Sequence, residues 1–145
     1  MGFHMLTTIE KVLFLQDVDI FEFTSTEDLA HIAAITEEIE FQAGEVIFKE
    51  DEIPDSMYIV IEGNVSLTRG SQEVMVAKDK DFFGTWALFD DEPRVATATT
   101  LEKSLLLRID KEDFVDLLAD YVAITQSILK SLVKRLRRLM LRISK

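Results

Sequence analysis

The chain has no cysteine, and only two histidines and two prolines occur among its 145 residues. The lack of cysteine excludes disulfides, thiolate metal sites and a cysteine nucleophile. Imidazole can come only from His4, in the opening Met-Gly-Phe-His-Met segment, or from His31, which falls in an apolar helical pattern and is interpreted as structural. No carboxylate pair has a reason to be buried, so we predict a protein that is not an enzyme.

Long apolar runs and a targeting segment are also missing. No stretch approaches the roughly 20 apolar residues of a membrane span, and the start lacks the basic and apolar regions of a signal peptide. We therefore predict a cytoplasmic chain with no transmembrane segment. The length is typical of one domain, assigned to residues 8–145, and residues 1–7 are interpreted as a leader foreign to that domain.

Basic residues are scarce everywhere except at the end of the chain. The formal net charge is −11, but residues 1–129 hold nine Lys and Arg against all 27 acids, a balance of −18. Residues 130–145 hold seven basic residues and no acid, a balance of +7. We expect the body to repel nucleic acid and anionic lipid, and the last segment to attract an acidic protein partner.

Apolar spacing predicts helices at both ends and strands between them. A helix is predicted over Thr7–Gln16. A capping-box pattern, formed by Ser25 and Asp28 or by Thr24 and Glu27, predicts a second helix that runs to about Glu38. Short segments with a period of two follow, with hairpin turns at Gly63-Asn64 and Gly70-Ser71. This pattern predicts an α+β, mainly β fold: an antiparallel β-roll or jelly-roll barrel flanked by helices. The predicted strands lie at 39–41, 46–48, 57–62, 65–68, 73–77, 95–98 and 104–109.

Glycine, aromatic residues, acids, proline and a lone arginine gather in the stretch FFGTWALFDDEPRVATA at 82–98. Gly84 follows two phenylalanines and precedes a short helix-compatible run, Thr85–Phe89, whose first amides favour an anion. Arg94 lies nine residues past Thr85, after an acidic turn that we interpret as a solvated loop rather than a metal site. We predict a pocket for a small anion between backbone amides and a guanidinium. In the alternative interpretation, Arg94 is a surface residue paired with Asp90, Asp91 or Glu92.

The same stretch resembles the phosphate-binding cassette of cyclic nucleotide-binding domains, which runs F-G-E-x-A-L, a short loop, then P-R-x-A-[TS]. In that family the arginine holds the cyclic phosphate and the glutamate accepts from the ribose 2′-hydroxyl. The resemblance implies an eight-stranded β-roll with a short cassette helix, no required cofactor, and cAMP or cGMP as ligand. The position of the glutamate is Thr85 here, so we interpret the cassette as degenerate; Asp51, Lys80 and Asp91 also depart from the family pattern. The implied ligand-binding residues are Phe83, Gly84, Thr85, Trp86, Ala87, Arg94 and Ala96.

A long amphipathic helix is predicted over Val122–Ile143. Its leucines follow alternating spacings of three and four over about two heptads, and the basic residues fall on the opposite side. This stripe packs on the chain's own barrel, on a second copy, or on a membrane surface. The stripe consists of Leu129, Leu132, Val133, Leu136, Leu139, Met140 and Ile143.

Together these features predict a non-enzymatic regulatory module, part of a larger protein. It binds a cyclic nucleotide weakly at most and transmits its state through the C-terminal helix, as a homodimer. In the alternative, the nucleotide site has decayed and the chain is an interaction or dimerisation domain.

Overall fold

The computed structural model describes residues 5–143, and the chain divides into two compact units. The first unit is formed mainly by Ile35–Val115 and contains the strands of the described chain. The second combines Leu6–Ala34 with Asp116–Lys145 and is helical. Residues 1–4 of the predicted leader, including His4, lie outside the described residues.

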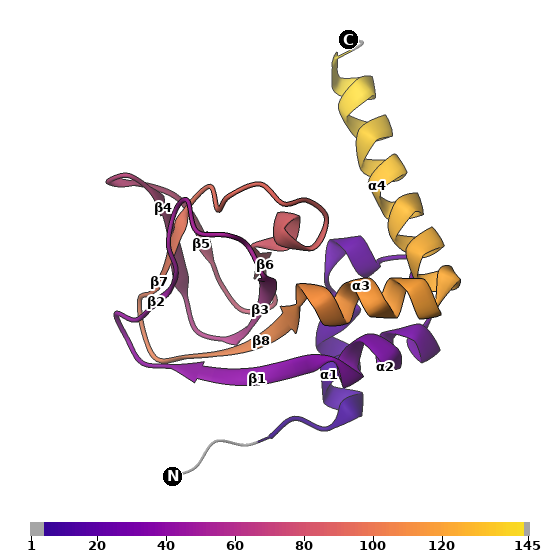
Figure 1. Ribbon diagram of the computed structural model, residues 1–145, viewed down its shortest axis with the longest axis horizontal. Coiled ribbons are helices and arrows are strands. Elements are labelled where there is room, and N and C mark those ends of the chain that lie inside the picture. Colours follow the sequence, from indigo (N-terminus) through magenta and orange to yellow (C-terminus); the bar gives the residue numbers. More distant parts are fainter. Residues whose placement is uncertain (1–4, 144–145) are drawn as a thin grey trace. The chain divides into compact units, whose positions relative to one another are not determined.

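The first unit consists of two four-stranded antiparallel sheets, with strand orders β1-β8-β3-β6 and β2-β7-β4-β5 (Figure 1). β8 pairs with β1 from Thr36↔Ile109 to Phe41↔Ser104, and on its other side with β3. The mainly β, antiparallel β-roll predicted from the sequence is confirmed. The strands are β1 (Thr36–Phe41), β2 (Val46–Phe48), β3 (Ser56–Glu62), β4 (Val65–Arg69), β5 (Gln72–Ala77), β6 (Phe82–Phe83), β7 (Thr97–Thr100) and β8 (Ser104–Asp110).

One of the two predicted hairpin turns is present. Gly70-Ser71 joins β4 to β5, which pair from Arg69↔Gln72 onward. Gly63-Asn64 is not a hairpin turn, because β3 and β4 belong to different sheets and this step carries the chain from one sheet to the other. Gly63 adopts a φ of 124°, and an added Cβ would lie 2.6 Å from the Cβ of Ser104. The glycine therefore permits a close crossing of two strands rather than a tight reversal.

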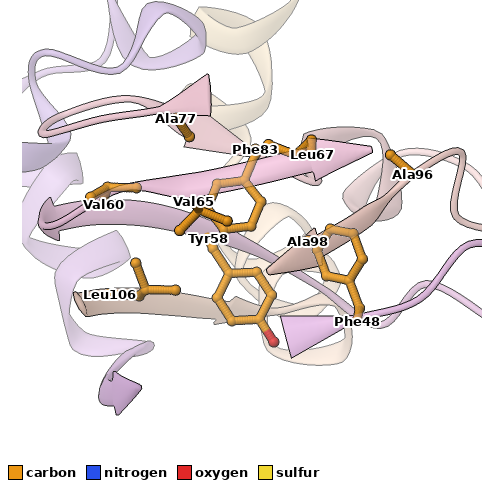
Figure 2. Close-up of a cluster of buried hydrophobic side chains, with 10 residues drawn as sticks. All are labelled: Phe48, Tyr58, Val60, Val65, Leu67, Ala77, Phe83, Ala96, Ala98 and Leu106. Carbon is orange, nitrogen blue, oxygen red and sulfur yellow. The ribbon is translucent and has the colours of Figure 1, made fainter. Parts of the chain in front are cut away.

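Side chains from both sheets meet in the hydrophobic core of the first unit (Figure 2). β3 is buried along Ser56–Ile61, which reads as a continuous apolar run because both of its faces are covered. β1 instead alternates between half-buried and exposed residues, as expected for a strand at the edge of its sheet. The core residues are Phe48, Tyr58, Val60, Val65, Leu67, Ala77, Phe83, Ala96, Ala98 and Leu106.

The second unit brings the two helical ends of the chain together. α1 begins at a capping box, in which the Glu10 amide donates to Thr7 Oγ1 (3.1 Å) and the Thr7 amide donates to Glu10 Oε1 (2.9 Å). α3 starts in the first unit and ends in the second. The helices are α1 (Thr8–Leu15), η1 (Asp19–Phe21), α2 (Thr26–Ala34), α3 (Lys111–Asp120) and α4 (Val122–Ile143).

α2 is shorter than the sequence predicted. Its start is confirmed, because the amide of Asp28 donates to Ser25 Oγ (3.1 Å). Its end at Ala34 contradicts the prediction of a helix to about Glu38. Residues 36–41 instead form β1, where backbone pairing along the whole of β8 outweighs the local helical pattern.

α4 packs within the second unit through a face that is not the leucine stripe. The buried residues are Ile124, Ile128 and Ser131, and Ser131 Oγ donates to the carbonyl of Asp19 in η1 (2.9 Å). Leu136 is 60% exposed and Ile143 is 82% exposed. In the part of the chain that the structure describes, no helix is both long and apolar enough to cross a membrane.

Candidate functional site

The predicted cassette begins where β6 gives way to a short 3-10 helix, η2 (Thr85–Leu88). Gly84 joins the two with a φ of 74°, a conformation that residues with a Cβ rarely adopt. The amide of Ala87 donates to the carbonyl of Gly84 (3.1 Å), so this amide of the helix start already has a backbone partner. The chain then forms a loop over 90–96 and enters β7 at Thr97.

β7 begins two residues later than the predicted strand 95–98. The reason is a pair of backbone hydrogen bonds: Arg94 donates to the carbonyl of Glu52 (2.9 Å), and Asp51 donates to the carbonyl of Arg94 (2.9 Å). These bonds hold the main chain at Arg94 against the segment between β2 and β3. As a result, the side chain of Arg94 is carried into the first unit instead of into solvent.

Arg94 is only 6% exposed, and several groups of the first unit surround its guanidinium. Nη2 donates to the carbonyl of Ser56 (2.8 Å) and lies 3.6 Å from Asp55 Oδ1. Nη1 lies 3.5 Å from the carbonyl of Gly84, at the limit of a hydrogen bond. The interpretation of Arg94 as a surface residue paired with the acids at 90–92 is therefore wrong.

An aromatic cluster supports the arginine. The guanidinium carbon lies 3.9 Å from the centre of the Phe48 ring, a cation–π contact. Phe48 in turn packs against Tyr58 and Phe83, with ring centres 6.1 and 6.0 Å away, and Figure 2 shows these three rings together in the core. Phe83, a predicted site residue, thus packs against the ring that contacts the arginine.

Two buried polar atoms at this site lack a hydrogen-bond partner: Nε of Arg94 and Oγ1 of Thr85. Buried donors and acceptors are rarely left unpaired in proteins, and exceptions often mark a site that a ligand or ion completes. An oxyanion suits the first atom, because an arginine fork binds phosphate oxygens through parallel N–H donors. The residues present therefore fit an anionic ligand.

The remaining predicted site residues fall in the same part of the first unit. Ala87 and Ala96 are buried, 3% and 4% exposed, and Ala96 belongs to the core cluster. Trp86 lies in η2, but its side chain is outside the described part of the structure.

Burial lowers the pKa of Arg94 below its ordinary value, while the negative charges of Asp55 and Glu52 act in the opposite direction. Arginine titrates so far above neutrality that the group stays charged at pH 7. A charge this deeply buried is costly unless it is paired, and Asp55 is 70% exposed at its side chain. The site therefore retains an attraction for a second negative charge.

Asp55 connects the arginine to the start of α3. Its Oδ2 lies 3.6 Å from Nη2 of Arg108, and the same nitrogen lies 3.4 Å from Asp110 Oδ2. Asp110 Oδ1 accepts from the amides of Glu112 (3.0 Å) and Asp113 (3.3 Å), which caps the first turn of the helix. The acid at the start of α3 suits the positive end of the helix dipole.

The loop that precedes Arg94 is fastened to α3 as well. Lys111 Nζ donates to the carbonyl of Asp90 (2.7 Å) and to Asp91 Oδ1 (2.5 Å), and we name these two contacts the loop clasp. The ring of Phe89 meets Phe114 edge to face, with centres 5.8 Å apart. The loop and the first turns of α3 are therefore joined by side-chain contacts.

Sequence reasoning did not find Phe48, Asp55, Ser56 or Lys111 as members of this site. Phe48 was predicted only as a strand residue, and Ser56 contributes a backbone carbonyl, which no sequence pattern can reveal. Asp55 lies 39 residues before Arg94 in the sequence, and Lys111 lies 17 residues after it. The pairing of β3 with β8, in which Ser56 faces Asp110, brings Asp55 and Lys111 together. Asp55 and Lys111 could have been predicted as site residues only if the register between β3 and β8 were known.

The fold is an antiparallel β-roll, and its candidate site contains a buried arginine whose Nε has no hydrogen-bond partner among the described residues. The sequence profile of the cyclic nucleotide-binding domain matches residues 38–121, which is more than half of the chain. The chain therefore belongs to the cyclic nucleotide-binding domain family, as its cassette indicated.

Known relatives support this placement. The chain is 31% identical, over 115 residues, to a CRP-like cAMP-activated global transcriptional regulator of Mycobacterium tuberculosis, covering 74% of this chain and 51% of the relative. It is 32% identical over 114 residues to a cAMP-dependent protein kinase regulatory subunit of Dictyostelium discoideum, covering 73% and 33%. It thus spans about half of the first relative and a third of the second.

A solved structure agrees along almost its whole length. The crystal structure of the N-terminal domain of a transcriptional regulator from Streptomyces coelicolor A3(2) superposes with a TM-score of 0.82 at 28% identity. The superposition covers 87% of this chain and 94% of that domain.

Proposed function

We propose that this chain is a regulatory module that binds a cyclic nucleotide at Arg94 and reports binding through its C-terminal helices. The observation that carries the proposal is the state of Arg94: nearly fully buried, stacked on Phe48, and with Nε unpaired. A singly charged cyclic phosphate would supply the missing acceptor and charge. The relatives support a regulatory role without chemistry on the ligand, since one is a transcriptional regulator and the other a kinase regulatory subunit.

We infer weak binding, micromolar or poorer. Thr85 offers a neutral hydroxyl at the position where the family pattern has glutamate, and a hydrogen bond to a charged group is worth about 1.5–3 kcal/mol. Because about 1.4 kcal/mol is a factor of ten, this change weakens affinity by about one to two decades. The carbonyl of Ser56 already accepts from Arg94, so a phosphate must share or replace that contact.

Transmission would pass from the loop to α3 through side-chain contacts, and from α3 to α4 along the chain. The loop clasp and the contact between Phe89 and Phe114 join the cassette to the first turns of α3. A ligand that pulls the loop toward Arg94 would strain these contacts and shift α3. The output domain would lie elsewhere in a larger protein, as the partial coverage of the relatives suggests.

A second candidate is an interaction domain whose nucleotide site has decayed. It is favoured by Thr85, whose buried hydroxyl replaces the expected carboxylate, and by the exposed leucine stripe of α4. In this case the stripe would be the functional surface, and no nucleotide would bind.

Calorimetry with cAMP and cGMP tests the proposal. We expect weak binding by the wild type, tightening of about ten- to a hundredfold in Thr85→Glu, and loss of binding in Arg94→Ala. Arg94→Lys, which keeps the charge but loses the fork, should bind more weakly than the wild type. Arg69→Ala removes an exposed arginine at the end of β4 and serves as the matched control.

Two results would contradict the proposal. One is nanomolar binding by the wild type, and the other is equal binding by wild type and Arg94→Ala. If neither wild type nor Thr85→Glu binds, the chain is the interaction domain of the second candidate.

A further inference from the structure

The face of α4 that packs inside the second unit continues past the point where its contacts with η1 end. Its residues follow alternating spacings of four and three, so they lie along one side of the helix. The first half of this line is buried and uncharged, and the second half consists of arginines. We name this line the docking seam; it consists of Ile124, Ile128, Ser131, Arg135, Arg138 and Arg142.

The docking seam is distinct from the leucine stripe of the same helix. At 3.6 residues per turn, the two lines are centred roughly 100° apart around the helix axis. Leu136 and Leu139 of the stripe are exposed, whereas Ile124 and Ile128 of the seam are buried. Association of two copies through the stripe would therefore leave the arginines of the seam accessible.

The contacts in the middle of the seam show which groups it pairs with. Ser131 Oγ donates to the carbonyl of Asp19 (2.9 Å), and the guanidinium of Arg135, one turn further on, lies 3.2 Å from Asp19 Oδ2. Beside the seam, Lys134 Nζ donates to Glu22 Oε2 (2.8 Å). The two acids that meet α4 thus lie three residues apart, in and directly after η1. Carboxylates at helical spacing therefore match the basic residues of α4.

The last part of the seam has no such partner. Within the described residues, the ion pairs of α4 end at Arg135, and Arg138 and Arg142 are exposed. Arg135 keeps an open donor, because its buried Nη2 forms no hydrogen bond in the described part of the chain despite the nearby carboxylate. The hydrogen bond from Lys134 lowers the pKa of Glu22, and the charge of Arg138 adds to this effect without an ion pair. Two arginines aligned with a docked face are thus free to bind another carboxylate.

We propose that the arginine half of the docking seam binds an acidic helix of a partner protein, with carboxylates spaced three or four residues apart. A guanidinium fork matches the two oxygens of a carboxylate, and Asp19 beside Arg135 already shows this pairing. The partner helix would continue the line of η1 along Arg138 and Arg142. This inference goes beyond the proposed function and does not depend on nucleotide binding.

The charge distribution of the chain favours a compact acidic partner over an extended anionic surface. Residues 1–129 carry a balance of −18, so a membrane or a nucleic acid that attracts α4 also repels the rest of the chain. The acidic bodies of two copies repel each other in the same way. A single helix with a few carboxylates avoids this repulsion because it contacts only the seam.

The test titrates the full chain, at low salt, with an alanine-rich helical peptide that carries glutamates at alternating spacings of three and four. A control peptide carries glutamine at the same positions. NMR follows the side-chain Nε–H signals of Arg138 and Arg142, and the titration gives the dissociation constant of the peptide.

Two variants separate the seam from the general charge of the helix. The seam variant carries Arg138→Gln and Arg142→Gln. The control variant carries Lys130→Gln and Arg137→Gln, which remove the same charge from exposed residues of α4 that lie off the seam. Circular dichroism and thermal melts show whether each variant keeps its helices.

We expect the glutamate peptide to shift the Nε–H signals of Arg138 and Arg142 in the wild type. Because exposed ion pairs are individually weak, we expect binding to the seam variant to be about five- to tenfold weaker than to the wild type or the control variant. Added salt should reduce this difference.

Several results would overturn the inference. It is wrong if the wild type does not bind the glutamate peptide, if the glutamine peptide binds equally well, or if both variants weaken binding alike. It is also wrong if vesicles of phosphatidylserine and phosphatidylcholine, or a DNA duplex, bind the same arginines more tightly than the peptide does. Loss of self-association in the seam variant alone would make a second copy the occupant instead. In each case the calorimetry with cAMP still decides the proposed function independently.

Discussion

At the scale of single residues, Gly84 combines an unusual backbone with a close neighbour. Its φ is 74°, and an added Cβ would lie 2.8 Å from Nη1 of Arg94. We expect Gly84→Ala to lower the free energy of unfolding by about 1–2 kcal/mol, because the left-handed conformation strains a residue with a Cβ and the arginine must move. Urea denaturation measures this loss. An unchanged midpoint would show that the turn adopts another conformation at little cost.

Gly70→Ala is a useful comparison for that variant. Gly70 also has a positive φ, 60°, but an added Cβ there meets nothing within 4 Å. The two variants share the backbone strain and differ in the contact with Arg94. We therefore expect cAMP binding to weaken in Gly84→Ala and to remain in Gly70→Ala.

Asp51 and Lys80 hold left-handed conformations without being glycine, with φ of 68° and 72°. Their amides donate to the carbonyls of Arg94 (2.9 Å) and Val60 (2.7 Å), so neither backbone can relax freely. We expect Lys80→Gly to raise the free energy of unfolding by about 0.5–1 kcal/mol, because relief of strain exceeds the entropy that glycine loses. Asp51→Gly should gain less, since aspartate tolerates this region better than lysine. Equal denaturation midpoints for wild type and Lys80→Gly would contradict this expectation.

At the scale of elements, the loop clasp joins the cassette loop to α3 and gives it a dependence on pH. The hydrogen bond from Lys111 lowers the pKa of Asp91 below its ordinary value, and the positive charge of Lys111 adds to the effect. A carboxylate with a lowered pKa stabilises the clasped loop fully at pH values above its ordinary range. The contribution is lost as the pH falls through the lowered value, so the clasp stays closed at neutral pH and opens only in acid.

NMR titration of the Asp91 carboxyl measures this coupling. We expect Lys111→Met to return the Asp91 pKa to the ordinary range and to speed exchange of the backbone amides at Asp90, Asp91 and Glu92. Lys111→Arg keeps a positive donor and should largely preserve the wild-type titration. The clasp would be unimportant if Asp91 titrated identically in wild type and Lys111→Met.

α4 presents two different faces. The basic residues near its middle contact other parts of the second unit. Lys134 Nζ lies 2.8 Å from Glu22 Oε2. The Nζ atoms of Lys130 and Lys134 lie 4.7 and 5.1 Å from the centre of the Phe23 ring. Arg135 lies 3.2 Å from Asp19 Oδ2. The positive charge of the helix is therefore partly matched inside the unit, whereas the leucine stripe is left exposed.

At the scale of the whole molecule, the exposed stripe predicts that two copies associate through α4. Contiguous apolar surface on a helix with heptad spacing favours a second helix over water. We expect the wild type to sediment as a dimer at tens of micromolar and Leu136→Glu to sediment as a monomer. Leu141→Glu adds the same charge at a leucine of similar exposure, 67%, that lies off the stripe, and should leave the dimer intact.

A monomeric wild type at high micromolar concentration would contradict this prediction. So would equal dissociation by the two glutamate variants, because a general effect of charge on the helix would then explain the result. Hydrogen exchange along α4 separates the cases, because a dimer slows amide exchange around the exposed Leu136 and Leu139 beyond the protection that the helix alone gives.

Several features of the protein could be read from local sequence. The period of two in the strands, the cap at Ser25, the acids that open α3 and the hairpin at Gly70-Ser71 depend on neighbours within a few residues, and all of them are present. The cassette stretch also indicated the family directly. These features are accessible because hydrophobic period, capping and turn chemistry are local properties.

The tertiary structure decided the rest. Glu38 lies in a strand because β8, far along the chain, pairs with residues 36–41, and Gly63 crosses between sheets because Ser104 lies against it. The ion partner of Arg94 is Asp55 rather than the three acids beside it in sequence, because backbone bonds turn its side chain into the first unit. The sequence by itself determined which helices and strands form and that Arg94 is the arginine of the candidate site. Long-range strand pairing, which no local pattern encodes, decided which groups surround Arg94.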